Sequence, residues 1–331
     1  MQASVKTRVG IMRGGQGENY TSSLKRGGEI ISYLLENLSD KYKPVDILID
    51  KEGLWHLGGM PIKPANLVHK VDIVWNTAHP SLSMILDNLS IPNIGVGSFS
   101  HTLENSKEML REHMNKMNVS MPRHILIPAY FADIDARPQT PERSDGGQGP
   151  RERYAIKKAK EVHAKFASPW IVKSFTPDAN MAIHLAKTFD ELVAGIEDGV
   201  NHNKSILVEE FIPGTVASLH SVPHFRNEEI YIFPPVNVFG SLSAENKNKL
   251  SLLVKDLHHH LGAKHYLKSN FLLNKRGKIF LLDFESVPNL KSHSHFSQAC
   301  ESVGAKMHHV VEHILEQTGV WCNGNIHDSG S

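Results

Sequence analysis

Two acidic residues, Asp283 and Glu285, follow an apolar run in the segment KIFLLDFES. The run at 279–282 comes after a turn signal at 274–277, which predicts the second strand of a hairpin. Side chains two apart in a strand point to the same face, so the two carboxylates converge. Carboxylates on one face repel each other and lose hydration, and the pattern therefore predicts cations that balance them.

Composition bounds the class of protein. The chain has 331 residues, 40% of them hydrophobic, which is enough for two or three domains. Its 36 basic and 35 acidic residues argue against nucleic acid as a partner. No run approaches the roughly 20 apolar residues of a membrane span, so no membrane partner is expected. Cys300 and Cys322 lack a CxxC spacing and favour a cytoplasmic location. Most of the 21 histidines are expected to be surface or packing residues.

Apolar strand runs alternate with segments of helical period, which predicts a layered α/β fold. The first hundred residues predict one open-sheet domain, with a helix at 21–38 and strands at 9–12, 45–49, 71–75 and 94–97. The rest predicts helices at 106–117 and 151–166, strands at 170–173, 206–211 and 230–233, and a hairpin over 266–284. Residues 137–150 are rich in Pro, Gly and charge and predict an exposed loop.

Six segments together indicate a family. In chain order they are VGIMRGGQGEN, SIPNIGVGS, SKEMLREHMNKMNVSMP, PWIVKSF, ILVEEFIPG and LLDFESVPNLKSHSHF. In this order the chain resembles the ATP-grasp ligases and, within them, the D-alanine–D-alanine ligases. The resemblance implies an N-terminal substrate domain with an open parallel sheet at 1–102, a central ATP-grasp subdomain at 103–209 and a C-terminal subdomain with a metal site at 210–331. ATP is expected between the last two, which would be α+β domains.

The resemblance also implies nucleotide-binding residues. Lys173, at the end of WIVK, and Lys107, at the start of a helix, match lysines that contact the phosphates. A lysine at a helix start opposes the helix dipole, whereas a phosphate there is well held. The segment that receives adenine is matched by Glu209, Glu210, Phe211 and Ile212. The alternative is a solvated lysine at a strand end and an edge strand with one wet face.

The metal ligands implied by the resemblance are Asn270, Asp283 and Glu285. The family order is Asp, Glu, Asn, whereas here it reads Asn, Asp, Glu, so the total charge is kept. All three offer oxygen atoms, which suit Mg²⁺, with Mn²⁺ as the alternative ion. The competing interpretation is a chance acidic pair at a strand end.

Substrate-binding residues match the family less closely. Glu18 stands in place of the glutamate that receives the first substrate's ammonium, and Ser294 matches the position that holds the second substrate's carboxylate. Lys268 replaces an arginine that stabilises the tetrahedral intermediate. The lysine keeps the positive charge but lacks the planar guanidinium group with its fixed donors. Asn289 replaces a glycine of the oxyanion site, and Val216 replaces the glutamate that holds the ribose.

Two loops also depart from the family. The serine- and glycine-rich loop after the phosphate-binding lysine is FTPDAN at 175–180, and the connection that closes the acceptor site is shortened around 240–248. His79 matches a family histidine, but the Gly-Glu-Asp segment after it is missing.

These features give two hypotheses. The first is an ATP-dependent carboxylate–amine ligase that joins small amino acids through an acyl-phosphate, with a homodimer left open. The second is a catalytically degenerate, nucleotide-binding regulatory protein. The retained metal ligands and lysines favour the first, and the altered acceptor loop and Asn289 favour the second.

Overall fold

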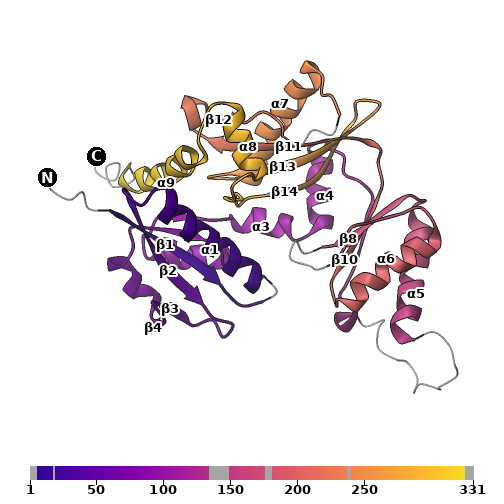
Figure 1. Ribbon diagram of the computed structural model, residues 1–331, viewed down its shortest axis with the longest axis horizontal. Helices are drawn as coiled ribbons and strands as arrows, with labels where there is room; N and C mark the ends of the chain where they lie inside the picture. Colours follow the sequence, from indigo (N-terminus) through magenta and orange to yellow (C-terminus); the bar gives the residue numbers. More distant parts are fainter. Residues whose placement is uncertain (1–5, 18, 134–148, 176–180, 237–239, 325–331) are drawn as a thin grey trace. The chain divides into compact units, whose positions relative to one another are not determined.

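The computed structural model describes residues 6–17, 19–133, 149–175, 181–236 and 240–324, with side chains as far as residue 319 (Figure 1). The chain forms two compact units. The first comprises Met1–Val119, Thr215–Leu273 and Leu281–Ser331, and the second comprises Ser120–Gly214 and Asn274–Phe280. Within the described ranges, two sheets belong mainly to the first unit and one to the second.

The N-terminal sheet has the strand order β4-β3-β2-β1-β5-β6. Four strands pair in parallel, namely β1 (Thr7–Gly14), β2 (Tyr42–Ile49), β5 (Ile73–Asn76) and β6 (Asn93–Ile94). Strand β1 lies at the centre, and its Val9, Ile11 and Met12 are fully buried. The predicted open parallel sheet is therefore confirmed, with each strand at or next to its predicted position.

An antiparallel hairpin extends this sheet beyond β2 and was not predicted. It consists of β3 (Trp55–Leu57) and β4 (Met60–Ile62), joined by Gly58 and Gly59. Both glycines have positive φ, +58° and +82°. Two-residue hairpin turns require this backbone conformation, which glycine adopts without strain. The glycine pair was thus the available sequence signal.

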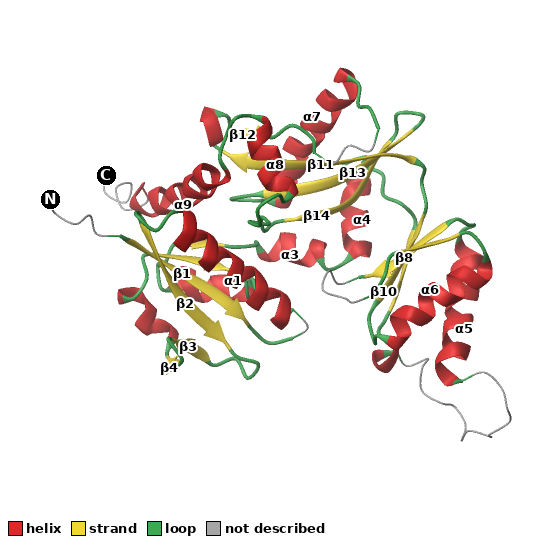
Figure 2. Cartoon of the chain, viewed as in Figure 1, coloured by secondary structure: helices red, strands yellow, loops and turns green. Residues whose placement is uncertain are grey.

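Helices α1 (Tyr20–Asn37) and α9 (Met307–Gly324) share a hydrophobic core with this sheet (Figure 2). Leu34 of α1 and Ile314 of α9 are buried in the same cluster as Trp75 of β5. This core joins the first hundred residues to the last described helix. Shorter helices complete the region, namely η1 (Pro64–His69), α2 (Ser81–Asn88) and α3 (Ser98–Glu104).

The C-terminal sheet has the strand order β12-β11-β13-β14. Its strands are β11 (Gly214–Pro223), β12 (Ile230–Ile232), β13 (Leu267–Asn274) and β14 (Ile279–Glu285). The nearby helices are α4 (Lys107–Lys116), η4 (Phe225–Asn227), α7 (Ala244–Leu261) and α8 (His295–Ser302).

The two faces of this sheet differ in polarity. One face carries the buried Leu219 and Phe271, together with Ser221, whose hydroxyl lies 2.9 Å from Nδ1 of His258 on α7. Helix α7 therefore covers this face. Because side chains alternate along a strand, Ser218, Asn270 and their alternate neighbours lie on the opposite face.

The sheet of the second unit is antiparallel, with the strand order β7-β10-β8-β9. Its strands are β7 (His124–Ile127), β8 (Trp170–Ser174), β9 (His184–Ala186) and β10 (Ile206–Glu210). It shares a core with α5 (Pro150–Lys165) and α6 (Phe189–Asn201), next to a short helix η2 (Tyr130–Ala132). Thr188 and Glu191 form a capping box at the start of α6, which satisfies backbone N–H groups there.

Each sheet draws its strands from one predicted domain range, apart from Glu210 at the end of β10. The three domain boundaries themselves stay predictions. Several elements have no counterpart among the predicted ones, namely helices α2, α3, α6, α7, α8 and α9 and strands β7, β9 and β11. In the parts of the chain that the structure describes, no helix has the length and hydrophobicity to cross a membrane.

Packing of Phe271 against the covered face can be tested directly. Its side chain is fully buried on β13, so Phe271→Ala should lower the free energy of unfolding by about 3–5 kcal/mol. Leu252→Ala is the control, because Leu252 on α7 is 65% exposed and should change stability by less than about 0.5 kcal/mol. Urea denaturation followed by circular dichroism measures both, and an unchanged midpoint for Phe271→Ala would contradict this packing.

Candidate active site

The polar face of the C-terminal sheet carries two cross-strand rows of side chains. The first, the amide row, contains Ser218 of β11, Asn270 of β13 and Asp283 of β14. The Ser218 hydroxyl donates to Asn270 Oδ1 at 2.5 Å, and Asn270 Nδ2 donates to Asp283 Oδ1. The asparagine is therefore fixed from both sides, with its amide nitrogen toward the carboxylate.

The second row, the lysine row, contains His220, Lys268 and Glu285. Lys268 Nζ lies 2.7 Å from Glu285 Oε1, and the two side chains are 18% and 47% exposed. His220 lies two residues beyond Ser218 on β11 and is fully buried. Lys268 is thus one of the cations that balance the predicted pair of carboxylates.

The predicted metal ligands are brought together on this face. Asn270 contacts Asp283, and Glu285 lies on the same face two residues along β14. Two carboxylates and one amide oxygen are ligands that Mg²⁺ accepts. The described residues contain no group of three or more His, Cys, Asp or Glu side chains arranged to hold a metal. Such an ion would therefore depend on Asn270 as well as the two carboxylates.

The chain from α3 to α4 runs beside β14. Lys107, the buried first residue of α4, donates from Nζ to the carbonyl of Leu282. Glu104, at the end of α3, accepts a hydrogen bond from the Ser286 backbone N–H. Both termini of this connection therefore reach the strand that carries Asp283 and Glu285.

Glu104 is a charged residue of the site that sequence reasoning missed. Burial raises its pKa, the nearby carboxylates of Glu285 and Asp283 add to this rise, and the charge of Arg26 opposes it, so that the pKa is about 7. An acidic residue three positions before Lys107 was the only sequence signal. Nothing in that spacing indicates that Glu104 lies near β14, 180 residues later.

Ser294 caps α8 and has its hydroxyl proton engaged. Its Oγ accepts from the Ser297 N–H at 3.1 Å and donates to the Asn289 carbonyl at 2.9 Å. A hydroxyl has one proton to donate. Ser294 must therefore release Asn289 before it can donate to a substrate carboxylate, and that role stays a prediction.

The second unit contains the other predicted nucleotide-binding residues. Lys173 Nζ, at the end of β8, lies 2.7 Å from Glu209 Oε2 on β10. Glu210 accepts from the backbone N–H and from Nε of Arg123, at 3.1 and 2.5 Å. Phe211 is 39% exposed, and Ile212 is half-buried. Lys173 and Glu209 thus form one ion pair, while Glu210 serves a separate one.

Some predictions lie partly or wholly outside the described residues. Glu18 is outside them, as are residues 176–180 of the FTPDAN loop. The region predicted as a shortened connection, 240–248, contains the start of α7 at Ala244, capped by the Ser243 side chain.

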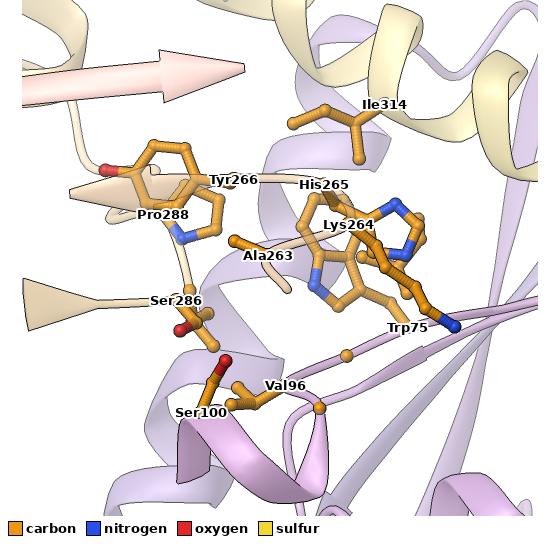
Figure 3. Close-up of a pocket in the computed structure, with 14 residues that line it drawn as sticks. Trp75, Val96, Ser100, Ala263, Lys264, His265, Tyr266, Ser286, Pro288 and Ile314 are labelled. Atoms are coloured by element: carbon orange, nitrogen blue, oxygen red, sulfur yellow. The ribbon is translucent and has the colours of Figure 1, made fainter. Parts of the chain in front are cut away.

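A small pocket in the first unit lies next to the end of β14 (Figure 3). Its lining includes Trp75, Ser100 of α3, Tyr266 and Ser286. The cavity volume of about 10 Å³ has room for about one water molecule. The buried Ser286 hydroxyl has no hydrogen-bond partner within the described ranges, so a water would satisfy it here. This pocket is too small for a nucleotide or an amino acid.

The fold defines the class of protein. D-alanyl-alanine synthetase A from Vibrio cholerae O1 biovar eltor matches with a TM-score of 0.66 and 16% identity, over 96% of this chain and 100% of that chain. D-alanine–D-alanine ligase from Bacillus anthracis, solved in complex with ATP, matches with a TM-score of 0.63 and 15% identity, over 97% and 100%. The chain has the three-domain ATP-grasp fold of these structures.

Sequence comparison gives the family. The family described as D-ala D-ala ligase C-terminus matches residues 148–316, about half of the chain, and the chain belongs to it. The D-alanine–D-alanine ligase of Haemophilus influenzae (strain PittEE) is 26% identical over 182 residues. That match covers 50% of this chain and 61% of the relative, so the chain spans less than two thirds of the relative's length. The predicted resemblance is confirmed.

The raised pKa of Glu104 predicts a pH-dependent stability. A carboxyl whose pKa rises from 4.5 to about 7 on folding stabilises the fold when protonated. Its contribution is complete below pH 4.5 and is lost as the pH rises to 7. Glu104→Gln keeps the oxygen that accepts from Ser286 and should be more stable than the wild type at pH 8, by at most about 3 kcal/mol, with no gain at pH 4.

Urea denaturation in EDTA at both pH values measures this difference. The control is Glu112→Gln, which changes an exposed glutamate on α4. If Glu104→Gln gives the same change at pH 4 and pH 8, the burial of its charge is not what limits stability.

Proposed function

We propose that this chain is an ATP-dependent carboxylate–amine ligase that joins small amino acids through an acyl-phosphate. The observation that carries the proposal is the polar face of the C-terminal sheet, which holds the amide row and the lysine row. The chain that carries this face belongs to the D-alanine–D-alanine ligase family. One substrate carboxylate would take the γ-phosphoryl group from ATP. The amine of the second substrate would then attack the activated carbonyl, and phosphate would leave.

Phosphoryl transfer needs positioning and charge neutralisation more than covalent chemistry. We assign Lys107 and Lys173 to the phosphates, and Glu209, Glu210, Phe211 and Ile212 to the adenine. The carboxylates of Asp283 and Glu285 would hold magnesium together with Asn270 Oδ1, once the Asn270 amide turns away from Ser218. The ion would supply positive charge to the triphosphate. Glu285 is half exposed and can turn from Lys268 toward an ion without burying a charge.

Lys268 would stabilise the negative charge that develops during acyl transfer. Its side chain is mostly buried within the lysine row, where a charge interacts more strongly than in water. Glu18 would receive an ammonium group, and Ser294 a carboxylate after it releases Asn289. We also propose a cytoplasmic location, supported by the two cysteines without CxxC spacing, and domain boundaries at 1–102, 103–209 and 210–331.

The second candidate is a nucleotide-binding regulatory protein without ligase activity. The observation that favours it is that the charged side chains of both rows already have partners. Lys268 already neutralises Glu285, and Asn270 already donates to Asp283. Asn289, in place of a family glycine, points in the same direction because its side-chain oxygen is engaged by the Lys291 N–H at 3.1 Å.

Nucleotide binding can be tested through the Lys173–Glu209 pair. Changing Lys173 alone would remove the ammonium that faces the buried Glu209 carboxylate, so the test is the double variant Lys173→Gln with Glu209→Gln. Its affinity for magnesium-ATP should fall about 100-fold, equivalent to about 2.8 kcal/mol. The control is Lys187→Gln, an exposed lysine before α6 in the same unit. Calorimetry that finds equal affinity in all three proteins would reject this nucleotide site.

Ligase activity is tested by phosphate release and product mass spectrometry over D-alanine, L-amino acids and hydroxy acids. We expect amino-acid-dependent phosphate release, with a fraction of ATP hydrolysed without product because the connection at 240–248 is short. Lys268→Met should lower this release about 100-fold with ATP affinity retained. Lys255→Met, at an exposed position on α7, is the control. Firm ATP binding without release on any substrate would favour the regulatory candidate.

A further inference from the structure

His220 is a buried histidine with one ring nitrogen unsatisfied. Its side chain is 1% exposed, and its Nδ1 lies 2.7 Å from the Tyr266 hydroxyl. Its Nε2 has no hydrogen-bond partner within the described ranges. A buried polar atom without a partner is destabilising, and native structures contain few of them. The position therefore needs an explanation beyond packing.

The register places His220 beside Lys268. Ser218 contacts Asn270, and the Ser221 hydroxyl lies 3.3 Å from the Leu267 carbonyl, so the residues between them face each other across β11 and β13. Tyr266 lies two residues before Lys268 and therefore projects to the same face. The imidazole consequently belongs to the lysine row, on the polar face.

Its protonation state follows from its surroundings. Burial lowers the pKa of His220, and the charges of Lys268 and His295 add to this effect, so that the pKa is about 3. The imidazole is neutral near pH 7 and carries one N–H. The Tyr266 hydroxyl also stays protonated, because burial raises its pKa well above its usual value.

Hydrogen bonding indicates which nitrogen carries the proton. If Tyr266 donates to Nδ1, the hydroxyl proton is satisfied and Nε2 carries the hydrogen. If Nδ1 donates instead, the hydroxyl proton and the Nε2 lone pair both lack a partner within the described ranges. The first arrangement leaves fewer groups unsatisfied, and it places an N–H donor on Nε2 of a residue that faces Lys268 across the strands.

We propose that His220 Nε2–H and Lys268 Nζ together bind an anionic oxygen on the polar face, as a two-point site for phosphate or for the oxyanion of acyl transfer. The inference rests on the proposed function. Lysine is a point charge, whereas a guanidinium presents two fixed donors. A neutral imidazole beside Lys268 restores the second donor without placing two cations together.

The ring is held in place before any ligand arrives. The Tyr266 and Phe296 rings lie 5.9 and 5.5 Å from the imidazole centroid, and both side chains are buried. Donors fixed in advance stabilise developing charge most effectively, because they need no reorganisation during the reaction.

His258 offers a matched control. It is also buried, its Nδ1 also contacts a hydroxyl, that of Ser221 at 2.9 Å, and its Nε2 also lacks a partner within the described ranges. It lies on the covered face of the same sheet. The two histidines therefore share burial and a hydroxyl contact at Nδ1, and they differ in which face of the sheet they lie against.

The first test is independent of ligase activity. Long-range proton–nitrogen spectra of the histidine-labelled chain should show His220 as the Nε2–H tautomer. Titration with inorganic phosphate in the presence of magnesium-ADP should shift the His220 Nε2 signals, leave those of His258 in place, and have no effect in Lys268→Met. The Nδ1–H tautomer, an unchanged His220, or equal shifts in both histidines would overturn the proposal.

The second test uses the ligase assay. His220→Phe fills the site without a donor and should lower kcat about 100-fold with KM within about threefold. His220→Gln restores a donor, and its kcat should be at least about tenfold higher than that of His220→Phe. The kcat of His258→Phe should stay within about threefold of the wild-type value. Equal kcat losses for both phenylalanine variants would overturn the proposal. A wild type that shifts His220 with phosphate but ligates nothing would reject the ligase function and keep the anion site.

Discussion

Side-chain alternation in the C-terminal sheet is the constraint on which the candidate site depends. Every second side chain of each strand packs into the apolar layer under α7. The side chains between these positions must therefore lie on the other face. On that face the chain places Ser218, Asn270, Lys268 and Glu285. Because several of these groups are partly or fully buried, each needs a partner across the strands. The amide row and the lysine row provide those partners, and they fix the side chains where chemistry is expected.

One connection brings two distant residues to the same strand. The α3–α4 segment places Lys107 on the Leu282 carbonyl and Glu104 on the Ser286 N–H. These contacts put one cation and one carboxyl of raised pKa beside β14. They also explain why Lys107 can occupy the start of α4. Its ammonium extends away from the positive end of the helix dipole and donates to the Leu282 carbonyl.

The sequence predicted what depends on local periodicity. The four parallel strands, the hairpin of β13 and β14, and the convergence of Asp283 with Glu285 all follow from alternation and turn signals. His220 and Glu104 could not be found in this way. Each belongs to the site because an element distant along the chain is packed there, and single-sequence patterns do not encode that register. The hairpin of β3 and β4 was missed because its strands are only three residues long, too short for a period to show.

The order of the predicted metal ligands has an electrostatic consequence in this register. Asn270 faces Asp283, and Lys268 faces Glu285, so the amide row has one negative charge and the lysine row is neutral. With the family order at the same positions, two carboxylates would face each other in the amide row, and Lys268 would face an amide. That arrangement needs a cation to be tolerated, because facing carboxylates repel. The order in this chain keeps the two carboxylates in different rows, with Glu285 paired to Lys268, so an arriving ion must compete with Lys268 for Glu285. In this register, the order in this chain therefore avoids the repulsion between facing carboxylates that the family order would create.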